Sequence, residues 1–226
     1  MLHVPFADTA TAASPVQPSA FDLPSIAFLP APAAFAIVAE TEAHVPAREA
    51  LLDRAMGLGR TRKSSETIRR GRLPAEGLAF AAMAPDASLL GTVRLWHISA
   101  GSRENVAVPA LLLGPLAIDP AAQGLGLGGA MMRHAIAAAK ALGHGAIILV
   151  GDPEYYARFG FSTFATAGLA MPGPFEARRL LALELANGAL FGASGLIRPT
   201  GEIDLVSNGS VASEESAISV HIATAA

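Results

Sequence analysis

Glycine residues crowd one short stretch of this 226-residue sequence, at positions 124, 126, 128 and 129. An apolar segment ending in Ile118-Asp119-Pro120 comes before them, and an Ala/Met-rich segment typical of a helix follows. The first turn of a helix offers N–H groups without partners inside the helix, together with the positive end of the helix dipole. Because glycine has no side chain to keep phosphate oxygens away, this loop predicts a site for the pyrophosphate of a nucleotide-containing ligand.

The surroundings of the loop argue against two common nucleotide-binding motifs. Gly124, Gly126 and Gly129 have the spacing of a dinucleotide fingerprint, but that fingerprint belongs near the first strand, with an acidic residue closing the next strand. Here the loop lies in the middle of the chain, after strands typical of hairpins. A Walker loop would require Lys and then Ser or Thr after its last glycine, where Ala130 and Met131 stand instead.

Two sequence blocks together resemble a known family. Gln123-x-x-Gly126-x-Gly128, between a strand and an amphipathic helix, resembles the signature of the GNAT superfamily of acyl-CoA N-acyltransferases. One helix and one short strand later, Tyr156-x-x-x-Gly160-Phe161 resembles the Tyr-x-x-x-Gly-Phe element of that superfamily. Leu-Gly-Pro-Leu-Ala before the loop and Gly-Asp-Pro-x-Tyr-Tyr after it are similar to the predicted acetyltransferases called YhbS-like. The resemblance covers roughly residues 35 to 200.

The resemblance implies that the ligand is acetyl-CoA, bound as a co-substrate. Main-chain N–H groups of the loop would hold the pyrophosphate, and the strand before the loop would offer its backbone to the pantetheine arm. Gly114-Pro115 predicts a bulge or a break in pairing on that strand, since proline cannot donate to a ladder. The residues expected to bind acetyl-CoA are Leu116, Ala117, Ile118, Gln123, Gly124, Leu125, Gly126, Leu127, Gly128, Gly129 and Tyr156.

The resemblance also implies a catalytic role for Tyr156, whose hydroxyl would lie near the thioester sulfur and act as general acid for the departing thiolate. A tyrosine that only packs in the core is the alternative for Tyr156, and Tyr155 is the second candidate for the acid. The general base is harder to find, because the strand over residues 106–118 carries no acidic side chain. His97 is a candidate base, since histidine titrates near neutral pH, although a histidine beside Trp96 is more often structural.

A basic run occupies residues 60–72, from Arg60 to Arg72. Its plain interpretation is a solvated helical face. In enzymes of the resembling family, the first two helices and their connection form one wall of the acceptor site, so the run would suit an acceptor that carries a carboxylate or a phosphate. Nucleic-acid binding is not expected, because aromatic residues are not interleaved with the basic ones and the net charge is −3.

These residues need an α/β (α+β) framework to position them. Alternating patterns predict a mixed sheet with helices packed on it. The resemblance implies a GNAT-like, mostly antiparallel central sheet, splayed in the middle, with helices on both faces. The predicted helices cover residues 46–56, 64–70 and 128–142, with a further helix from an N-cap at Asp152 to Gly160. The predicted strands cover residues 35–40, 78–84, 89–98, 106–118, 146–150, 161–164, 180–185 and 195–198.

The composition bounds the remaining expectations. Residues 1–34 are rich in Ala and Pro, which predicts a poorly ordered arm. We expect the acyltransferase domain over residues 35–205 and a tail over residues 206–226. The sequence has no cysteine, which excludes disulfides, thiolate metal sites and a cysteine nucleophile. We expect no metal, and no apolar run is long enough to span a membrane. Since the first residues also lack the pattern of a signal peptide, we expect a cytoplasmic protein.

The sequence therefore predicts an N-acetyltransferase that moves an acetyl (acyl) group from acetyl-CoA to a primary amine by direct attack in a ternary complex. The amine acceptor is open between a small molecule and a peptide or protein amine, and so is the question of a homodimer. The alternative is a non-catalytic acyl-CoA-binding or regulatory module with the same fold, which the lack of a carboxylate on the central strand keeps open.

Overall fold

The computed structural model describes residues 35–205. The arm predicted over residues 1–34 and the tail predicted over 206–226 lie outside the described residues. The helices are α1 (Val45–Met56), α2 (Ser64–Arg69), α3 (Leu127–Ala141) and α4 (Pro153–Tyr156). The strands are β1 (Ala36–Ala39), β2 (Ala79–Met83), β3 (Leu89–Arg103), β4 (Val106–Ile118), β5 (Ala146–Val150), β6 (Leu169–Ala170), β7 (Leu180–Glu184) and β8 (Ser194–Pro199).

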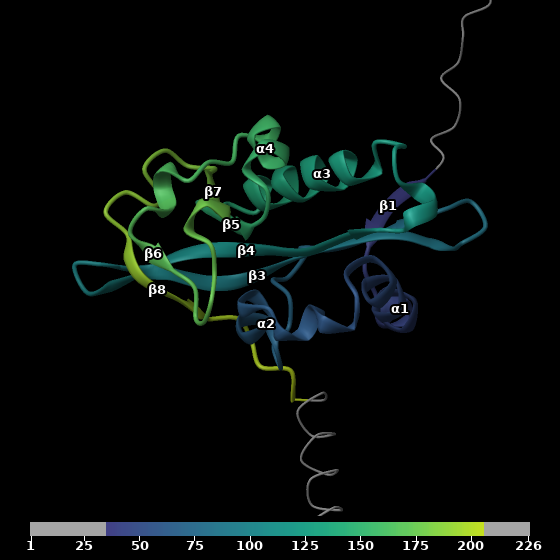
Figure 1. Ribbon diagram of the computed structural model, residues 1–226, viewed down its shortest axis with the longest axis horizontal. Coiled ribbons are helices and arrows are strands. Elements are labelled where there is room, and N and C mark those ends of the chain that lie inside the picture. The colour runs from purple at the N-terminus through teal and green to yellow at the C-terminus, as the bar shows by residue number, and fades with distance from the viewer. Residues whose placement is uncertain (1–34, 206–226) are drawn as a thin grey trace, which may run out of the picture. The chain divides into compact units, whose positions relative to one another are not determined.

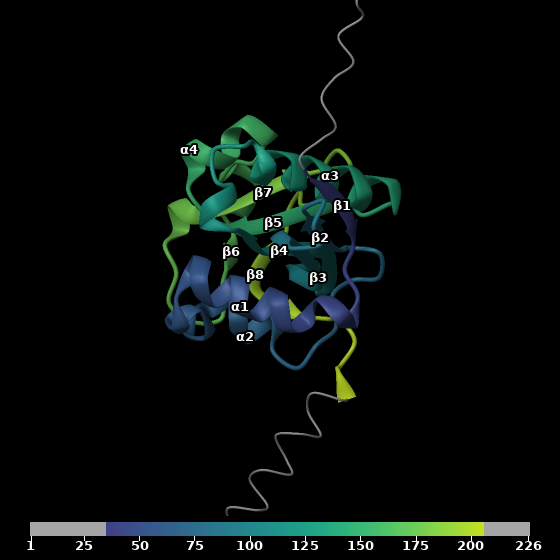
Figure 2. The ribbon, with the colours of Figure 1, turned by 90° about the vertical axis from the view of Figure 1, so that its right-hand side faces the viewer.

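One mixed sheet of eight strands forms the centre of the described residues. Its main order is β1-β2-β3-β4-β5-β7, and β8 pairs with both β3 and β6. Neighbouring strands run antiparallel except for the β4–β5 and β6–β8 pairs. Figures 1 and 2 show α3 and α4 on one face of the sheet and α1 and α2 on the other. The predicted fold class, with helices on both faces, is confirmed.

Each face of the sheet buries the apolar side of its helices. Met131, Met132 and Ala135 of α3 are fully buried in a cluster with side chains of β2, β3, β4 and β5. On the other face, Leu51 and Leu52 of α1 pack against the sheet, and Ile68 of α2 joins a second cluster with β3, β4 and β5. Because β5 lies between the two layers, its first four residues are buried, as its continuous apolar run predicts.

A buried charged cluster ties α1 to two strands. Arg48 of α1 donates to Glu40, just after β1, at 2.5 Å between Nη1 and Oε1. Thr92 of β3 also donates to Glu40, and Arg94 of β3 lies with its Nη1 3.9 Å from the same carboxylate. The Nε of Arg94 is buried without a hydrogen-bond partner. Burial, and then the charge of Arg48, lowers the pKa of the Arg94 guanidinium to about 10.

Three local predictions are corrected by the structure. Residues 161–164 form no strand: Gly160 turns the chain with φ +89°, and only Ser162 pairs with β7, at Ala182, before a 3₁₀ turn begins at Phe164. The predicted 152–160 helix has one short α segment followed by a 3₁₀ turn. Asp152 holds the N-cap position, but its side chain does not cap the helix and instead approaches Arg179 to 3.4 Å. The two-residue strand β6 was too short to predict.

Candidate active site

The glycine loop begins where β4 ends. Asp119 closes a short 3₁₀ turn by accepting a hydrogen bond from the N–H of Ala121 at 2.9 Å, and Arg54 of α1 pairs with the same carboxylate at 2.8 Å. The chain then passes through Gly124 at φ +83° and Gly126 at φ +74°, a left-handed conformation that glycine adopts without steric cost. Gly126 is the N-cap of α3, so these two glycines set the direction in which the helix starts.

The start of α3 faces a hollow of about 550 Å³. The first backbone bond into the helix runs from Ala130 N–H to Gly126 O at 3.0 Å, so the N–H groups of Leu127, Gly128 and Gly129 precede the ladder. A Cβ built on Gly124 or Gly126 would meet nothing within 4 Å, which leaves room for a ligand against the backbone. The lining residues are Ala55, Met56, Leu116, Ala117, Ile118, Ala122, Gln123, Gly124, Gly126, Leu127, Gly128, Gly129, Tyr155 and Arg158. This lining contains nine of the eleven residues predicted to bind acetyl-CoA; Leu125 is exposed and lies outside it, and Tyr156 lines the neighbouring cavity.

The predicted irregularity of β4 is a bulge at Gly114-Pro115. Val93 of β3 pairs with Leu116 and Leu95 with Leu113, so two residues of β4 stand opposite the single residue Arg94. The carbonyl of Gly114 turns to accept a buried hydrogen bond from Nε1 of Trp96 at 2.7 Å. The bulge therefore interrupts the ladder at the middle of β4, as the proline predicts.

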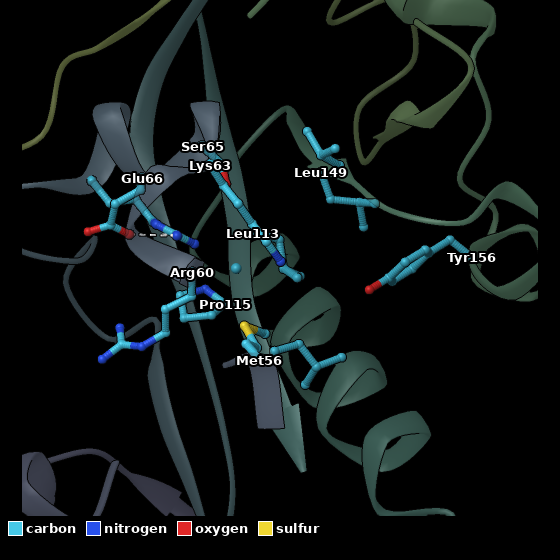
Figure 3. A pocket seen from close by; sticks show the side chains of 13 residues that line it. Met56, Arg60, Lys63, Ser65, Glu66, Leu113, Pro115, Leu149 and Tyr156 are labelled. Carbon is cyan, nitrogen blue, oxygen red and sulfur yellow. Dashed lines mark hydrogen bonds and ion pairs between the residues drawn. The ribbon is translucent and has the colours of Figure 1, made fainter. Parts of the chain in front are cut away.

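A second cavity opens where β4 and β5 diverge. The two strands pair only at Leu111–Ile147 and Leu112–Ile148, and they separate beyond these pairs. The cavity has a volume of about 110 Å³ and lies between the bulge, the end of β5 and the α1–α2 connection (Figure 3). It is lined by Met56, Arg60, Lys63, Ser65, Glu66, Arg69, Leu113, Gly114, Pro115, Leu116, Leu149, Val150 and Tyr156.

The two hollows meet along β4. Met56, at the end of α1, and Leu116, just after the bulge, line both of them. The hollow at the glycine loop and the cavity at the bulge therefore adjoin at Leu116.

Tyr156 enters the second cavity from the end of α4. Figure 3 shows its hydroxyl pointing into the cavity, toward the side lined by Pro115 and Met56. Its ring lies against Gly151, where any Cβ would collide with the ring. Burial, followed by the nearby Tyr155 and Asp152, raises the pKa of the Tyr156 hydroxyl to about 12. Tyr156 is thus held protonated at neutral pH.

Tyr155 faces the glycine loop instead. Its hydroxyl lies 3.3 Å from the position that a Cβ on Gly128 would take, and its ring lines the first hollow. The guanidinium of Arg158 lies 4.0 Å from the centre of this ring and lines the same hollow. Arg158 was missed as a binding candidate, although its place in the Tyr-x-x-x-Gly-Phe block, two residues after Tyr156, was visible in the sequence.

The basic run contributes three cations to the second cavity: Arg60, Lys63 and Arg69. Glu66 lines the cavity as well and pairs with Arg69 at 2.8 Å. This places the α1–α2 connection beside the bulge. Glu66 and Met56 were missed by the sequence reasoning, because no local pattern shows which side of α2 or which end of α1 faces β4.

The structure does not bring His97 to either hollow. His97 lies on β3, and its ring stacks near that of His144 with 5.4 Å between centroids. It lines a separate hollow with Glu76 and Glu202. Since His97 lines neither hollow, the geometry gives no support to the prediction of a base at this position. His134 of α3 packs edge-on against Phe80, at 4.6 Å between ring centroids.

Part of the chain matches a known family model. Residues 78–163, from the approach to β2 through the turn after α4, match the model described as the acetyltransferase (GNAT) domain. Both sequence blocks lie within the matched residues, so the resemblance stated from them is confirmed.

A curated relative also carries the name of an N-acetyltransferase. The chain is 32% identical over 85 residues to the uncharacterized N-acetyltransferase YhbS of Escherichia coli (strain K12), an alignment covering 38% of this chain and 51% of the relative. The chain thus spans about half the length of the curated relatives it matches.

Two solved structures share the fold. The GNAT family N-acetyltransferase YhbS from Escherichia coli, in complex with CoA, superimposes with a TM-score of 0.63 at 24% identity, over 75% of this chain and 92% of that chain. A GNAT family acetyltransferase from Brucella melitensis, in complex with acetyl-CoA, gives a TM-score of 0.51 at 22% identity, over 75% and 94% of the two chains. The predicted central sheet and its helices are therefore those of the GNAT fold.

Within residues 35–205, no helix is long and apolar enough to cross a membrane. Within the same range, no group of three or more His, Asp or Glu side chains is arranged to hold a metal ion.

Proposed function

We propose that this protein transfers an acetyl group from acetyl-CoA to a primary amine. The observation that carries the proposal is that the hollow at the glycine loop adjoins the cavity lined by Tyr156, with Met56 and Leu116 lining both. The hollow offers main-chain N–H groups suited to a pyrophosphate, and the cavity offers a largely buried hydroxyl.

The residues of the first hollow fit CoA. The open space over Gly124 and Gly126 and the first turn of α3 would receive the pyrophosphate, with the helix dipole favouring its negative charge. Arg158 adds a cation to the same lining. The pantetheine arm would follow β4 from Ile118 to Leu116, in the gap that opens as β5 diverges. The relatives in complex with CoA and acetyl-CoA support this assignment.

Acetyl-CoA supplies a thioester whose carbonyl carbon accepts the amine. In the proposed reaction the amine nitrogen forms a bond to that carbon, the carbon–sulfur bond breaks, and the thiolate takes a proton from the hydroxyl of Tyr156. The attacking nitrogen loses one of its two protons to water, and water returns a proton to the tyrosinate, so that the product is an amide and Tyr156 is again protonated. The sequence has no cysteine to form an acyl-thioester with the enzyme, which supports direct attack in a ternary complex.

Tyr156 suits this role by its environment. A hydroxyl whose pKa is raised to about 12 is protonated before the reaction and can donate when the thiolate develops beside it. The contact with Gly151 fixes the ring in the cavity. Most of the acceleration would come from holding the amine and the thioester together in the correct orientation.

One observation favours a second function, a non-catalytic acyl-CoA-binding module. The carboxylate among the described residues of the cavity is Glu66, and it is already committed to Arg69. A module without a free base could bind the ligand and transfer nothing.

Two measurements on the full chain decide between them. Calorimetry with acetyl-CoA tests binding, and release of free CoA thiol across a panel of primary amines tests transfer. Transfer to any amine supports the enzyme. Binding without thiol release above the rate of hydrolysis would support the module, and no binding of acetyl-CoA would overturn both.

A further inference from the structure

Three cations line the cavity at the bulge, but they differ in what neutralises them. Arg60 is paired with two carboxylates: its Nη2 lies 2.6 Å from Glu49, and its Nε lies 2.8 Å from Asp53. Both carboxylates belong to α1 and lie outside the cavity lining. Figure 3 shows the guanidinium of Arg60 pointing away from Tyr156. Arg60 therefore contributes little free charge to the cavity.

Lys63 is the cation of the lining whose side chain has no ion pair within residues 35–205. It stands between the 3₁₀ turn after α1 and the start of α2, and Figure 3 shows its side chain extending toward Leu113 of β4. An ammonium group in this position is free to take an anionic partner from a bound molecule.

Arg69 is the most deeply placed of the three. Its side chain is 10% exposed, and its Nη1 lies 3.5 Å from where a Cβ on Gly114 would stand, so the guanidinium lies over the bulge. Glu66 accepts a hydrogen bond from its Nη2. Because a guanidinium carries five N–H donors, Arg69 retains donors for a second anion after binding Glu66.

The cavity continues beyond Lys63. Lys63, Ser65 and Val150 also line a neighbouring hollow, which is completed by Phe175, Arg179 and other residues of the loop before β7. Lys63 therefore stands between the cavity that contains Tyr156 and a more open region. A group bound by Lys63 would be held on the α2 side, opposite Tyr156.

We propose that the amine acceptor carries a carboxylate or a phosphate, which Lys63 and Arg69 bind on the α2 side of the cavity while the amine faces the bulge and Tyr156. This proposal rests on the proposed acetyl transfer and adds the chemical class of its second substrate. Lys63 selects the anion, and Arg69, supported by Glu66, orients it.

The test uses matched acceptors that differ only in charge. ω-Amino acids of increasing chain length are compared with the corresponding ω-amino amides, and phosphoethanolamine is compared with ethanolamine. The expected result is a kcat/KM at least about tenfold higher for the anionic member of a pair, the size of one charge-assisted hydrogen bond. The series with the larger difference in kcat/KM between its anionic and neutral members then shows whether the site prefers a carboxylate or a phosphate.

Variants connect this preference to Lys63. Lys63→Gln should raise KM for the anionic acceptor about tenfold and leave KM for its neutral partner and for acetyl-CoA unchanged. Lys63→Arg, which keeps the charge, should restore most of the preference. Arg62→Gln removes the neighbouring exposed cation, which does not line the cavity, and serves as the control.

A binding measurement separates failure of this inference from failure of the proposed function. With CoA present, calorimetry compares an N-acetylated ω-amino acid with its amide. Tighter binding of the acid that is lost in Lys63→Gln supports the anion site even if no amine is acetylated. Equal kcat/KM for charged and neutral acceptors, or equal binding of acid and amide, would overturn the inference while leaving acetyl transfer intact.

Discussion

At the scale of single residues, Tyr155 and Tyr156 are adjacent in the chain but face different ligand regions. Tyr155 lies against Gly128 and Arg158 at the glycine loop, whereas Tyr156 lies against Gly151 and lines the cavity at the bulge. Both residues belong to α4, where consecutive side chains point in different directions around the helix axis, and their rings meet edge to face. A difference of one position therefore separates a side chain at the glycine loop from one in the cavity at the bulge.

The proposed acid predicts a specific loss. Tyr156→Phe keeps the ring against Gly151 but removes the donor, so kcat should fall about 100-fold with little change in KM for acetyl-CoA. The pKa of the hydroxyl is raised to about 12, so the hydroxyl keeps its proton up to about pH 10. Deprotonation of Tyr156 should therefore cause no fall in the wild-type kcat at any pH up to that value. Thiol release measured across pH checks both expectations.

Tyr155→Phe is the control for that experiment. It should leave kcat within about twofold, since its hydroxyl faces the first hollow. A large loss of kcat in Tyr155→Phe, with none in Tyr156→Phe, would reverse the two assignments.

At the scale of elements, the two ends of α3 have the same backbone conformation but different surroundings. Gly126 at the start has φ +74°, Gly143 just after the end has φ +82°, and a Cβ on either would meet nothing within 4 Å. Gly126 lines the hollow of the glycine loop, and Gly143 does not. Substitutions at Gly126 and at Gly143 should therefore strain the backbone to a similar extent, while only Gly126 lines the hollow.

Gly126→Ala and Gly143→Ala should each destabilise the protein by about 1 kcal/mol, because an L-residue is strained in the left-handed region. Only Gly126→Ala should also raise KM for acetyl-CoA, by about tenfold, since its methyl group would stand between the ligand and the backbone N–H groups. Thermal unfolding and acetyl-CoA titration measure the two effects. An equal change of KM in both variants would show that strain, not contact, governs binding.

The elements that the sequence predicts best are those with long, regular patterns. The bounds of β4 and β5 match the prediction, and those of α3 differ by one residue at each end, because apolar periodicity and glycines mark them. The prediction of a strand over residues 161–164 was wrong, because an apolar run does not show that only one of its residues will pair with a neighbouring strand. His97 was placed on the right strand, but its position relative to the cavity depends on the bulge and on packing.

At the scale of the whole described domain, the site depends on how the first helices are held against the sheet. Glu40 joins Arg48 of α1 to Arg94 and Thr92 of β3, and α1 in turn carries Met56, which borders both hollows. The sequence could not predict this cluster, because its members are distant in the chain and none lies in a recognisable motif.

Removal of the shared carboxylate should be costly. Glu40→Ala leaves Arg94, already buried with one unpartnered N–H, without a facing anion, so the free energy of unfolding should fall by about 3 kcal/mol. Glu42→Ala, at an exposed position two residues on, is the control and should change it by less than about 0.5 kcal/mol. Denaturant unfolding measures both, and similar values for the two variants would contradict a structural role for the cluster.

The bulge on β4 has a consequence for how this sheet can change over evolutionary time. The side chains that pack on the α3 side are those of Leu111 and Leu113 before the bulge and Leu116 and Ile118 after it. The extra residue shifts the alternation by one position, so that residues 116 and 118, and not 115 and 117, continue this face. A gene that lost one codon from Gly114-Pro115 would encode a regular strand with the same core on both sides. Such a shorter lineage would keep the architecture and lose the carbonyl turned toward Trp96, so one codon separates a regular strand from the bulge that lines the candidate site.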